Sequence, residues 1–488
     1  MNKMKNNKVV KDFDYYLDIK GTAIDGNYAG TFSSSLYTEL KGWVGLSVLS
    51  LAIAGSMALF IAFLRVPFAQ NFLDFDTQGI FEKGLITHVT FAFVIWYFGI
   101  HGALTILVSG KKGPSKKNNS FLGFIALFFA YLSIPLLLIP GLINLGLPSP
   151  NNYVPILIHP VFIMGLASLT VALVLIVLRL LINVSFDTKC ESVKFGIASA
   201  GLIFFIALSC LGISWLKMEP DLNSLERAEQ AFWGMGHVLQ FANTLLMFVS
   251  IHLLTRMNLG ITPLSDKGFK MISCLMVAGA SIGPMIYFSF AANSSDQLNA
   301  FTSLYWYVMP LPLGIFFFYF IFLLVRRAIS FRYQTPETIG LWITMILFSL
   351  GGLIGFFGGY SDTRTPAHYH AMLVAVTLVF MCLNFGLFFP ILNSKIPRAS
   401  LRLSTYFLLG FGQLLHSSGL YWAGLYGSAR KVSVGTQIFE NPNEIIFLTL
   451  MGFGGFMAVL GGVLYIVMSI YCFVKVPKES DRNKIAVV

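Results

Sequence analysis

Long apolar runs recur along the whole chain, and their length constrains the fold more than any other feature. Each approaches the roughly 20 apolar residues that cross a bilayer as a helix. Of the 488 residues, 56% are hydrophobic and 11% are charged. Because backbone groups cannot stay unpaired in lipid, such runs form helices. We predict an all-α polytopic membrane protein of twelve transmembrane helices. The predicted spans are 42–64, 84–108, 120–143, 153–181, 193–216, 229–255, 268–291, 302–325, 338–359, 366–393, 401–424 and 445–474.

These spans predict one transmembrane domain, residues 42–475, between two short tails. The N-terminal tail, residues 1–41, is rich in Lys, Asn and Asp at its start and lacks the apolar segment of a signal peptide. The C-terminal tail is 476–488. No soluble domain is expected between the spans.

The basic residues lie in alternate connections between the predicted spans. They occur at 3–11, 111–117, 189–194, 256–270, 326–332, 395–402 and 475–484. By the positive-inside rule these segments face the cytoplasm, so both termini are predicted to be cytoplasmic. The net charge of +11 is then a topology signal, and we expect no nucleic-acid partner.

Cysteines and acidic residues exclude several kinds of site. The five cysteines occur singly, without CxxC or CxxCH, which argues against a disulfide framework, a thiolate metal site and covalently attached haem. All Asp and Glu fall outside the predicted spans or at their edges. Because transporters usually need carboxylates or broken helices at mid-membrane, this pattern disfavours a transporter.

A His-x-His motif lies just inside the tenth predicted span, in Arg364-Thr-Pro-Ala-His368-Tyr-His370-Ala-Met. Intramembrane ionisable residues are rare and usually functional. At 100° per residue the two imidazoles project about 200° apart, towards opposite sides of one helix. Two neighbours could therefore share this helix as a wall.

Six of the eight histidines are predicted to lie at a similar depth, roughly 6–12 Å below the outer ends of their spans. They are His88, His159, His237, His368, His370 and His416. Imidazole is the usual axial ligand of haem iron and also binds copper. The layer therefore indicates a plane of metal ligands, whereas His101 and His252 lie deeper and are interpreted as structural.

These motifs resemble the catalytic subunit I of the haem-copper oxidase superfamily. Thr87-His88-Val-Thr-Phe-Ala-Phe-Val-Ile-Trp is similar to the family's second helix, and Ala367-His368-Tyr-His370 to its tenth. The resemblance implies that His88 and His370 bind a low-spin haem and that His368 binds a high-spin haem.

Further segments carry the resemblance at other points of the chain. Phe232-Trp-Gly-Met-Gly-His237-Val-Leu-Gln-Phe is similar to the sixth-helix segment whose His binds copper. Ala423-Gly-Leu-Tyr-Gly-Ser-Ala-Arg430-Lys431 is similar to the basic pair that holds haem propionates, and Asp362-Thr resembles family sequence near them. Without the resemblance, the alternative is that Arg430 and Lys431 belong to a solvated loop.

The chain departs from the family at the copper site. The family carries a His-His pair after the seventh span, but no His lies between His252 and His368. Tyr287 resembles the Tyr that precedes this pair by six residues in C-type members, and the same spacing here reaches Asn293 and Ser294. These residues are poor copper ligands. We expect copper to be absent or substoichiometric, unless a rearranged loop supplies another donor such as Tyr287, His159 or a partner's residue.

The resemblance implies a divergent respiratory-chain subunit with two haems, interpreted as b-type, that passes electrons to O₂ or NO. It implies other membrane subunits and an electron donor, either a cytochrome c, a cupredoxin-type subunit or a quinol, and a place in the bacterial inner membrane. His237 and Tyr287 are the candidate catalytic residues. Two alternatives stay open: a haem protein without turnover that serves as an electron relay, gas sensor or assembly component, and a transporter that shares only the span count.

Overall fold

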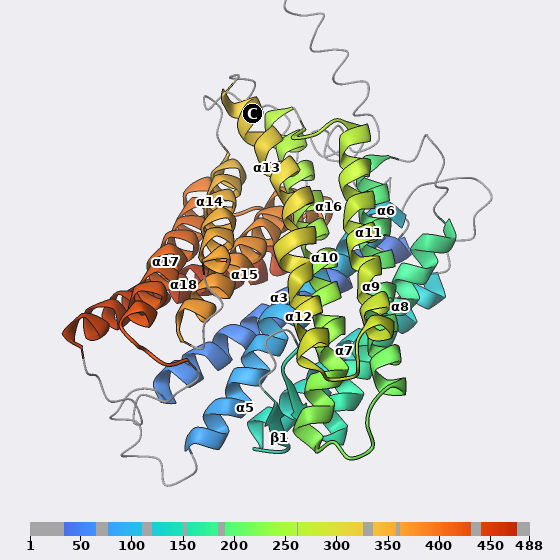
Figure 1. Cartoon of the computed structure of the whole chain (residues 1–488). Coiled ribbons are helices and arrows are strands. Elements are labelled where there is room, and N and C mark those ends of the chain that lie inside the picture. The colour runs from blue at the N-terminus through green and yellow to red at the C-terminus, as the bar shows by residue number, and fades with distance from the viewer. Residues whose placement is uncertain are drawn as a thin grey trace, which may run out of the picture.

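The computed structural model of the protein describes residues 34–64, 77–109, 120–149, 154–183, 191–260, 262–325, 335–357, 362–430 and 441–475. Within these ranges the chain is a bundle of long helices (Figure 1), which confirms the predicted all-α membrane fold. Eleven helical stretches of the described part are long and apolar enough to cross a membrane. A twelfth long helix, α17 (Ala399–Leu425), carries more polar side chains and packs between α15 and α18.

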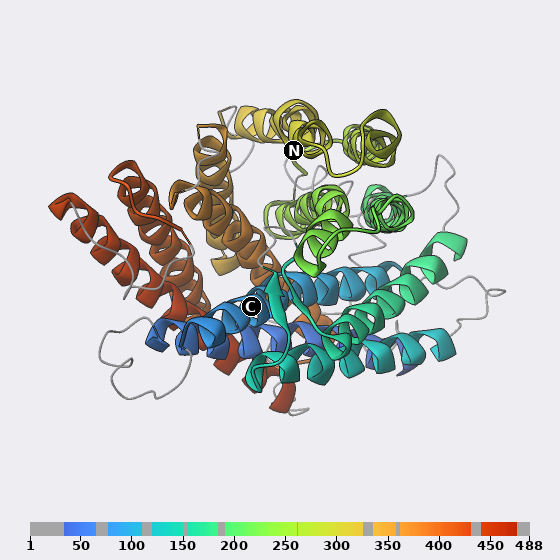
Figure 2. The ribbon, with the colours of Figure 1, turned by 60° about the horizontal axis from the view of Figure 1, so that its bottom comes forward.

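The helices follow the chain in three sets, which Figure 2 shows side by side as blue to teal, green to yellow and orange to red. The first set contains α3 (Ser34–Leu64), α5 (Thr77–Val89), η2 (Thr90–Ile95), α6 (Trp96–Ser109), α7 (Ser120–Leu142) and α8 (Pro160–Asn183). The second contains α9 (Ser192–Leu216), α10 (Ser224–Leu259), α11 (Asp266–Ser289), α12 (Ser295–Ser303), η3 (Leu304–Val308) and α13 (Pro310–Val325). The third contains α14 (Pro336–Phe356), α15 (Arg364–Leu383), η4 (Asn384–Phe388), α16 (Phe389–Ile391), α17 and α18 (Pro442–Val474).

Contacts between the sets join them into one bundle. Helix α10 packs against α14 and α15, α8 against α9, and α18 against α3. Helix α10 and the continuous helix made of α5, η2 and α6 are the most buried of the spans, with 94% of their apolar windows inside the protein. The core therefore runs along these two helices, whereas α7, α13 and α18 present large apolar side chains to the surroundings.

Three of the described spans contain a π-helical segment: η2 begins two residues after His88, η3 lies between α12 and α13, and η4 follows α15. A π-helical turn inserts one extra residue into a helix and is frequent at functional sites. The apolar runs in the sequence did not predict these segments.

The first predicted span begins too late. Helix α3 starts at Ser34 instead of residue 42, and it includes Glu39, which is fully buried. Arg179 of α8 compensates this carboxylate, with Nη2 2.6 Å from Oε2 and Nη1 3.2 Å from Oε1. Glu39 therefore lies inside the helix near the start of the span, and its partner is 140 residues away in sequence.

The fourth predicted span, in contrast, begins too early. Residues Leu147–Ser149 and Ile156–Ile158 form a two-stranded antiparallel hairpin, β1 and β2, in which Leu147 pairs with Ile158. Helix α8 starts only at Pro160, so His159 precedes the helix. Its Nδ1 accepts a hydrogen bond from Val161 N at 3.3 Å, which uses this ring nitrogen to begin the helix.

Candidate functional site

Four of the predicted layer histidines share one feature: Nδ1 lies within hydrogen-bonding distance of a backbone carbonyl. The pairs are His88 with Ala54 O at 2.9 Å, His237 with Trp233 O at 2.7 Å, His368 with Gly351 O at 2.7 Å and His416 with Met451 O at 2.9 Å. A carbonyl can only accept, so Nδ1 carries the proton in each ring. In the neutral imidazole Nε2 is then the nitrogen with the lone pair, which is the arrangement typical of metal-bound histidine.

Three of these carbonyls come from a neighbouring helix, so helix packing sets the ring orientation. Ala54 lies on α3, Gly351 on α14 and Met451 on α18. His237 differs because its acceptor, Trp233, belongs to the same helix, α10. Helices α5 and α10 begin seven and five residues before the predicted spans. The starts of α5 and α10 therefore do not place His88 and His237 at the common depth that was predicted for the layer.

His368 and His370 face different helices, as their predicted 200° separation requires. The His368 ring lies against α14, where a Cβ added to Gly355 would come within 2.3 Å of Nδ1. The His370 ring lies 4.9 Å from the His416 ring of α17, with the two planes at 69°. Helix α15 thus presents one imidazole to each of two neighbours. Glycines leave room beside these rings, since a Cβ on Gly455 would also approach His416 Nδ1 to 3.1 Å.

His237 lies in an aromatic cage. The Tyr305 ring of η3 stacks on it at 5.0 Å and 19°, and Trp233 and Phe301 lie at 4.8 Å and 5.8 Å between ring centroids. The Tyr305 hydroxyl donates to His237 O at 3.0 Å. Among the described residues, no group of three or more His, Cys, Asp or Glu is placed to hold a metal ion. The donor set around His237 therefore does not fit a copper ion held by three imidazoles.

Tyr287 lies one ring away from this cage. It is buried on α11, its ring is 5.1 Å from Phe301, and a Cβ on Gly234 would come within 2.2 Å of its hydroxyl. Among the described residues, this hydroxyl makes no hydrogen bond of ordinary geometry, although the Ser214 side chain and the Gly234 backbone lie near it. Phe301 contacts both Tyr287 and His237, so these two residues are linked only through its ring. The tyrosine that stacks on His237 is Tyr305, which the sequence did not indicate.

Asn293 and Ser294, which occupy the spacing expected for the copper histidines, have backbone roles. Asn293 adopts a positive φ of 54°, and Ser294 is the N-cap of α12, where its side chain accepts from Gln297 N at 3.2 Å. Asn favours the left-handed region and Ser favours N-caps. These residue types are therefore explained by the turn that starts α12.

The connection before α15 carries a second polar group. Arg364 binds Asp362 through Nε and Nη2, with Nη2 2.6 Å from Oδ2, and Asp362 pairs with Ala429 in an isolated antiparallel bridge. Partial burial raises the pKa of Asp362, but hydrogen bonds from Arg364 and the charges of Arg364 and Arg430 outweigh it and hold this pKa below its ordinary value. Arg430 is half-buried here, and Lys431 lies outside the described residues.

The two histidines that were predicted to lie deeper are both buried. His252 is fully buried against the Phe269 ring, at 4.5 Å, and neither of its ring nitrogens has a hydrogen-bond partner among the described residues. His101 is also buried. Their interpretation as structural residues stays a prediction.

Comparison with known proteins identifies the family to which these histidine-bearing helices belong. The family model "Cytochrome C and Quinol oxidase polypeptide I" matches residues 40–464. The chain belongs to this family. The predicted membership of the haem-copper oxidase superfamily is therefore confirmed, and a transporter that shares only the span count is excluded.

The chain is also similar to individual proteins. An uncharacterized protein of Rickettsia prowazekii is 25% identical over 87% of this chain and 94% of its own length. An uncharacterized protein of Aquifex aeolicus is 27% identical over 70% of this chain and 83% of its own length. A haem-copper terminal oxidase dimer solved by cryo-EM matches 93% of this chain and 85% of its own chain, with a TM-score of 0.67 and 16% identity. At this level of identity, the structural match shows that the two proteins share a fold.

Proposed function

We propose that this oxidase polypeptide I is a membrane haemoprotein that receives electrons at a low-spin haem and passes them to a high-spin haem, where O₂ or NO is reduced. The observation that carries the proposal is the fixed Nδ1 of His88 and His368, each donated to a carbonyl of the adjacent helix. This contact places the proton on Nδ1, so that the lone pair of Nε2 is available to a metal, and it fixes the orientation of the ring.

The proposed low-spin pair is His88 and His370. His88 would bind from α5 and His370 from α15, as the family resemblance implies. His416 is a further residue of this site, because its ring contacts His370 and its own Nδ1 is bound to Met451 O. We assign His416 a positioning role, in which it fixes the rotation of the His370 ring.

The proposed ligand of the high-spin haem is His368, on the side of α15 that faces α14. A haem held there would supply the iron chemistry that binds a diatomic gas. The chain's own contribution is to hold His368 through Gly351 O and to keep space beside the ring at Gly355.

The residues around His237 do not fit copper, so we derive no step through that metal. A tilted Trp233 ring and a stacked Tyr305 ring flank the imidazole, and the residues at the expected positions of the other two ligands form a turn and a helix cap. We propose that Tyr305 positions His237 through its stacked ring and through its bond to His237 O. Tyr287 stays a candidate catalytic residue, separated from His237 by Phe301.

Arg430 and Lys431 are proposed to bind haem propionates, together with Arg364. Guanidinium groups suit carboxylates because they donate two parallel hydrogen bonds. The charge of Arg430 acts on Asp362, which supports a cationic group at this end of α15.

The aromatic cage of His237 favours a second candidate function, a haem protein without turnover that acts as an electron relay or gas sensor. We also propose that the protein assembles with other membrane subunits and receives electrons from a donor, either a cytochrome c, a cupredoxin-type subunit or a quinol. We further propose the bacterial inner membrane as the location and cytoplasmic termini, on the basis of the Lys and Arg distribution.

Metal analysis and spectroscopy of the purified full chain test the proposal. We expect two b-type haems and little copper per chain. His368→Ala should abolish the CO-binding high-spin signal and leave the low-spin signal intact. His159→Ala is the matched control, because His159 uses its Nδ1 to accept a backbone hydrogen bond. Retention of the high-spin signal in His368→Ala would refute the ligand assignment. One tightly held copper per chain that is lost in His237→Ala would refute the absence of a copper site.

A further inference from the structure

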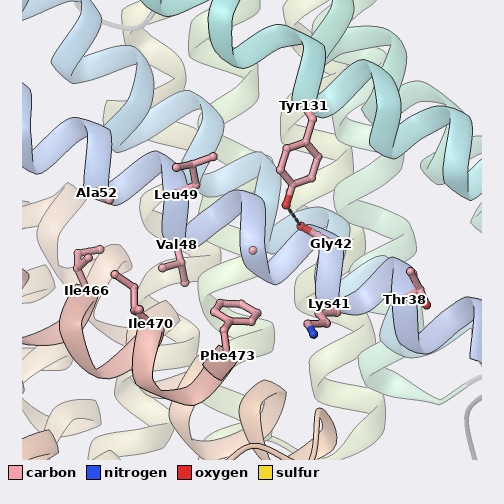
Figure 3. Close-up of a pocket in the computed structure, with 11 residues that line it drawn as sticks. Thr38, Lys41, Gly42, Val48, Leu49, Ala52, Tyr131, Ile466, Ile470 and Phe473 are labelled. Carbon is pink, nitrogen blue, oxygen red and sulfur yellow. Dashed lines mark hydrogen bonds between the residues drawn. The ribbon is translucent and has the colours of Figure 1, made fainter. Parts of the chain in front are cut away.

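A long apolar groove runs along the outside of the bundle between α3, α7 and α18, with a volume of about 470 Å³ (Figure 3). Its walls are mainly aliphatic and aromatic side chains, among them Val48 and Leu49 of α3 and Ile466, Ile470 and Phe473 of α18. Leu49 and Ile470 are 40% and 53% exposed, so the groove opens to the surrounding lipid.

Two glycines make the groove deep. Gly42 and Gly45 of α3 line it, and a Cβ on Gly45 would come within 2.9 Å of the Tyr131 hydroxyl. That hydroxyl donates to Gly42 O at 3.0 Å, so the one tyrosine in the wall is already hydrogen-bonded. The groove thus suits a hydrocarbon chain better than a small polar ligand.

The length of the groove matches one leaflet of a bilayer. Lys41 and Ala52 both line it and lie eleven residues apart on α3. At 1.5 Å per residue this is about 16 Å, and half of a hydrocarbon core is about 15 Å. An acyl chain whose head group lies at Lys41 would reach Ala52 near the middle of the membrane.

Positive charge gathers at one end of the groove. Lys41 lines that end, and Lys475 follows Phe473 by two residues at the end of α18. Lys395 N donates to Lys475 O at 3.1 Å, so the backbone of a third lysine lies next to Lys475. The nearby Glu39 is buried and neutralised by Arg179, so it does not offset these charges.

We propose that this groove is a binding site for an anionic phospholipid, with one acyl chain against Val48, Ile466 and Ile470 and the head-group phosphate at Lys41. Basic pockets between transmembrane helices on the cytoplasmic side are typical sites of anionic head groups. A neutral lipid would fill the same groove without the attraction at its basic end.

Native mass spectrometry of the full-length protein tests this site. The protein is exchanged into nanodiscs that contain equal amounts of phosphatidylglycerol and phosphatidylcholine, and the retained lipids are counted. Lys41→Ala should lower phosphatidylglycerol retention about five-fold, the factor for one lysine near a membrane surface, and leave phosphatidylcholine retention unchanged. Lys41→Arg should restore retention. Lys267→Ala removes an exposed lysine at the start of α11 and should have no effect.

A second variant acts through shape. Ala52→Phe should fill the inner end of the groove and lower retention of both lipids, whereas Gly314→Leu adds bulk on α13, where nothing lies within 4 Å, and should leave retention unchanged. Equal phosphatidylglycerol retention in Lys41→Ala and Lys267→Ala would overturn the proposal. So would the release by Ala52→Phe of a quinone, or of a helix of another subunit, in place of a phospholipid.

Discussion

Gly355 of α14 lies against the His368 ring, and its replacement by alanine tests the proposed high-spin ligand without touching the histidine. The added Cβ would lie 2.3 Å from His368 Nδ1 and 2.5 Å from Cε1. Non-bonded heavy atoms need about 3.5 Å, so the ring must shift by roughly 1 Å. A shift of this size away from α14 stretches the 2.7 Å contact between Nδ1 and Gly351 O beyond hydrogen-bonding distance.

The expected loss follows from the role of this contact. Removing the hydrogen-bond partner of a metal-bound histidine typically lowers metal affinity about 10–100-fold. This corresponds to about 1.4–2.8 kcal/mol of binding free energy. Titration of the haem-depleted protein with haem, followed by the CO difference spectrum, measures the affinity of the high-spin site. Low-spin absorbance should be unchanged, because His370 faces α17.

Gly352→Ala is the matched control for Gly355→Ala. It lies on the same helix, and an added Cβ meets nothing within 4 Å. Alanine improves helix stability by roughly 0.5–1 kcal/mol relative to glycine, so Gly352→Ala should bind haem normally and unfold at an equal or slightly higher temperature. If Gly355→Ala binds the high-spin haem as tightly as Gly352→Ala does, the packing of His368 against α14 does not control its ligation.

Three further predictions concern other parts of the molecule. His88→Ala and His370→Ala should each abolish the low-spin bis-histidine spectrum, and an unchanged spectrum in both would refute the pair. Glu39→Gln leaves the Arg179 charge buried and should cost about 3–5 kcal/mol of unfolding free energy, measured by thermal or denaturant unfolding; a loss below 1 kcal/mol would contradict the buried pair. Because the folded pKa of Asp362 is lowered, its stabilising contribution is present above the ordinary carboxyl pKa of about 3.9 and is lost as pH falls through the folded value. Asp362→Asn should therefore lower the unfolding temperature at neutral pH, and its difference from the wild type should vanish at lower pH; a difference that persists there would contradict it.

The number and the order of the helices could be predicted because each depends on a local property of the sequence. A run of about 20 apolar residues must form a helix in lipid wherever it occurs. The opposite orientation of His368 and His370 is similarly local, because it follows from the helical repeat alone. Both predictions agree with the structure, in which the two rings contact α14 and α17.

The errors arose where a distant residue decides the outcome. Glu39 looked like the end of a tail, but Arg179 of another helix allows α3 to include it. His159 looked like part of a span, but pairing of β2 with β1 delays the start of α8. Tyr305 carries no local signal, and the sequence placed His416 in the histidine layer without showing its neighbour. Only the packing of η3 on α10 and of α17 on α15 brings these residues to His237 and His370.

The region that corresponds to the family's copper site differs by more than the loss of two histidines. Asn293 supplies a left-handed residue and Ser294 caps α12, so the backbone has a use for both residue types. Histidine at 294 would remove the cap, at a cost of about 1 kcal/mol, and the Trp233 and Tyr305 rings would still flank His237. Restoring two histidines would therefore not be enough to rebuild a three-imidazole site. The proposed haem ligands are independent of this change, because α3 and α14 hold His88 and His368 through carbonyls that do not involve the 293–294 turn.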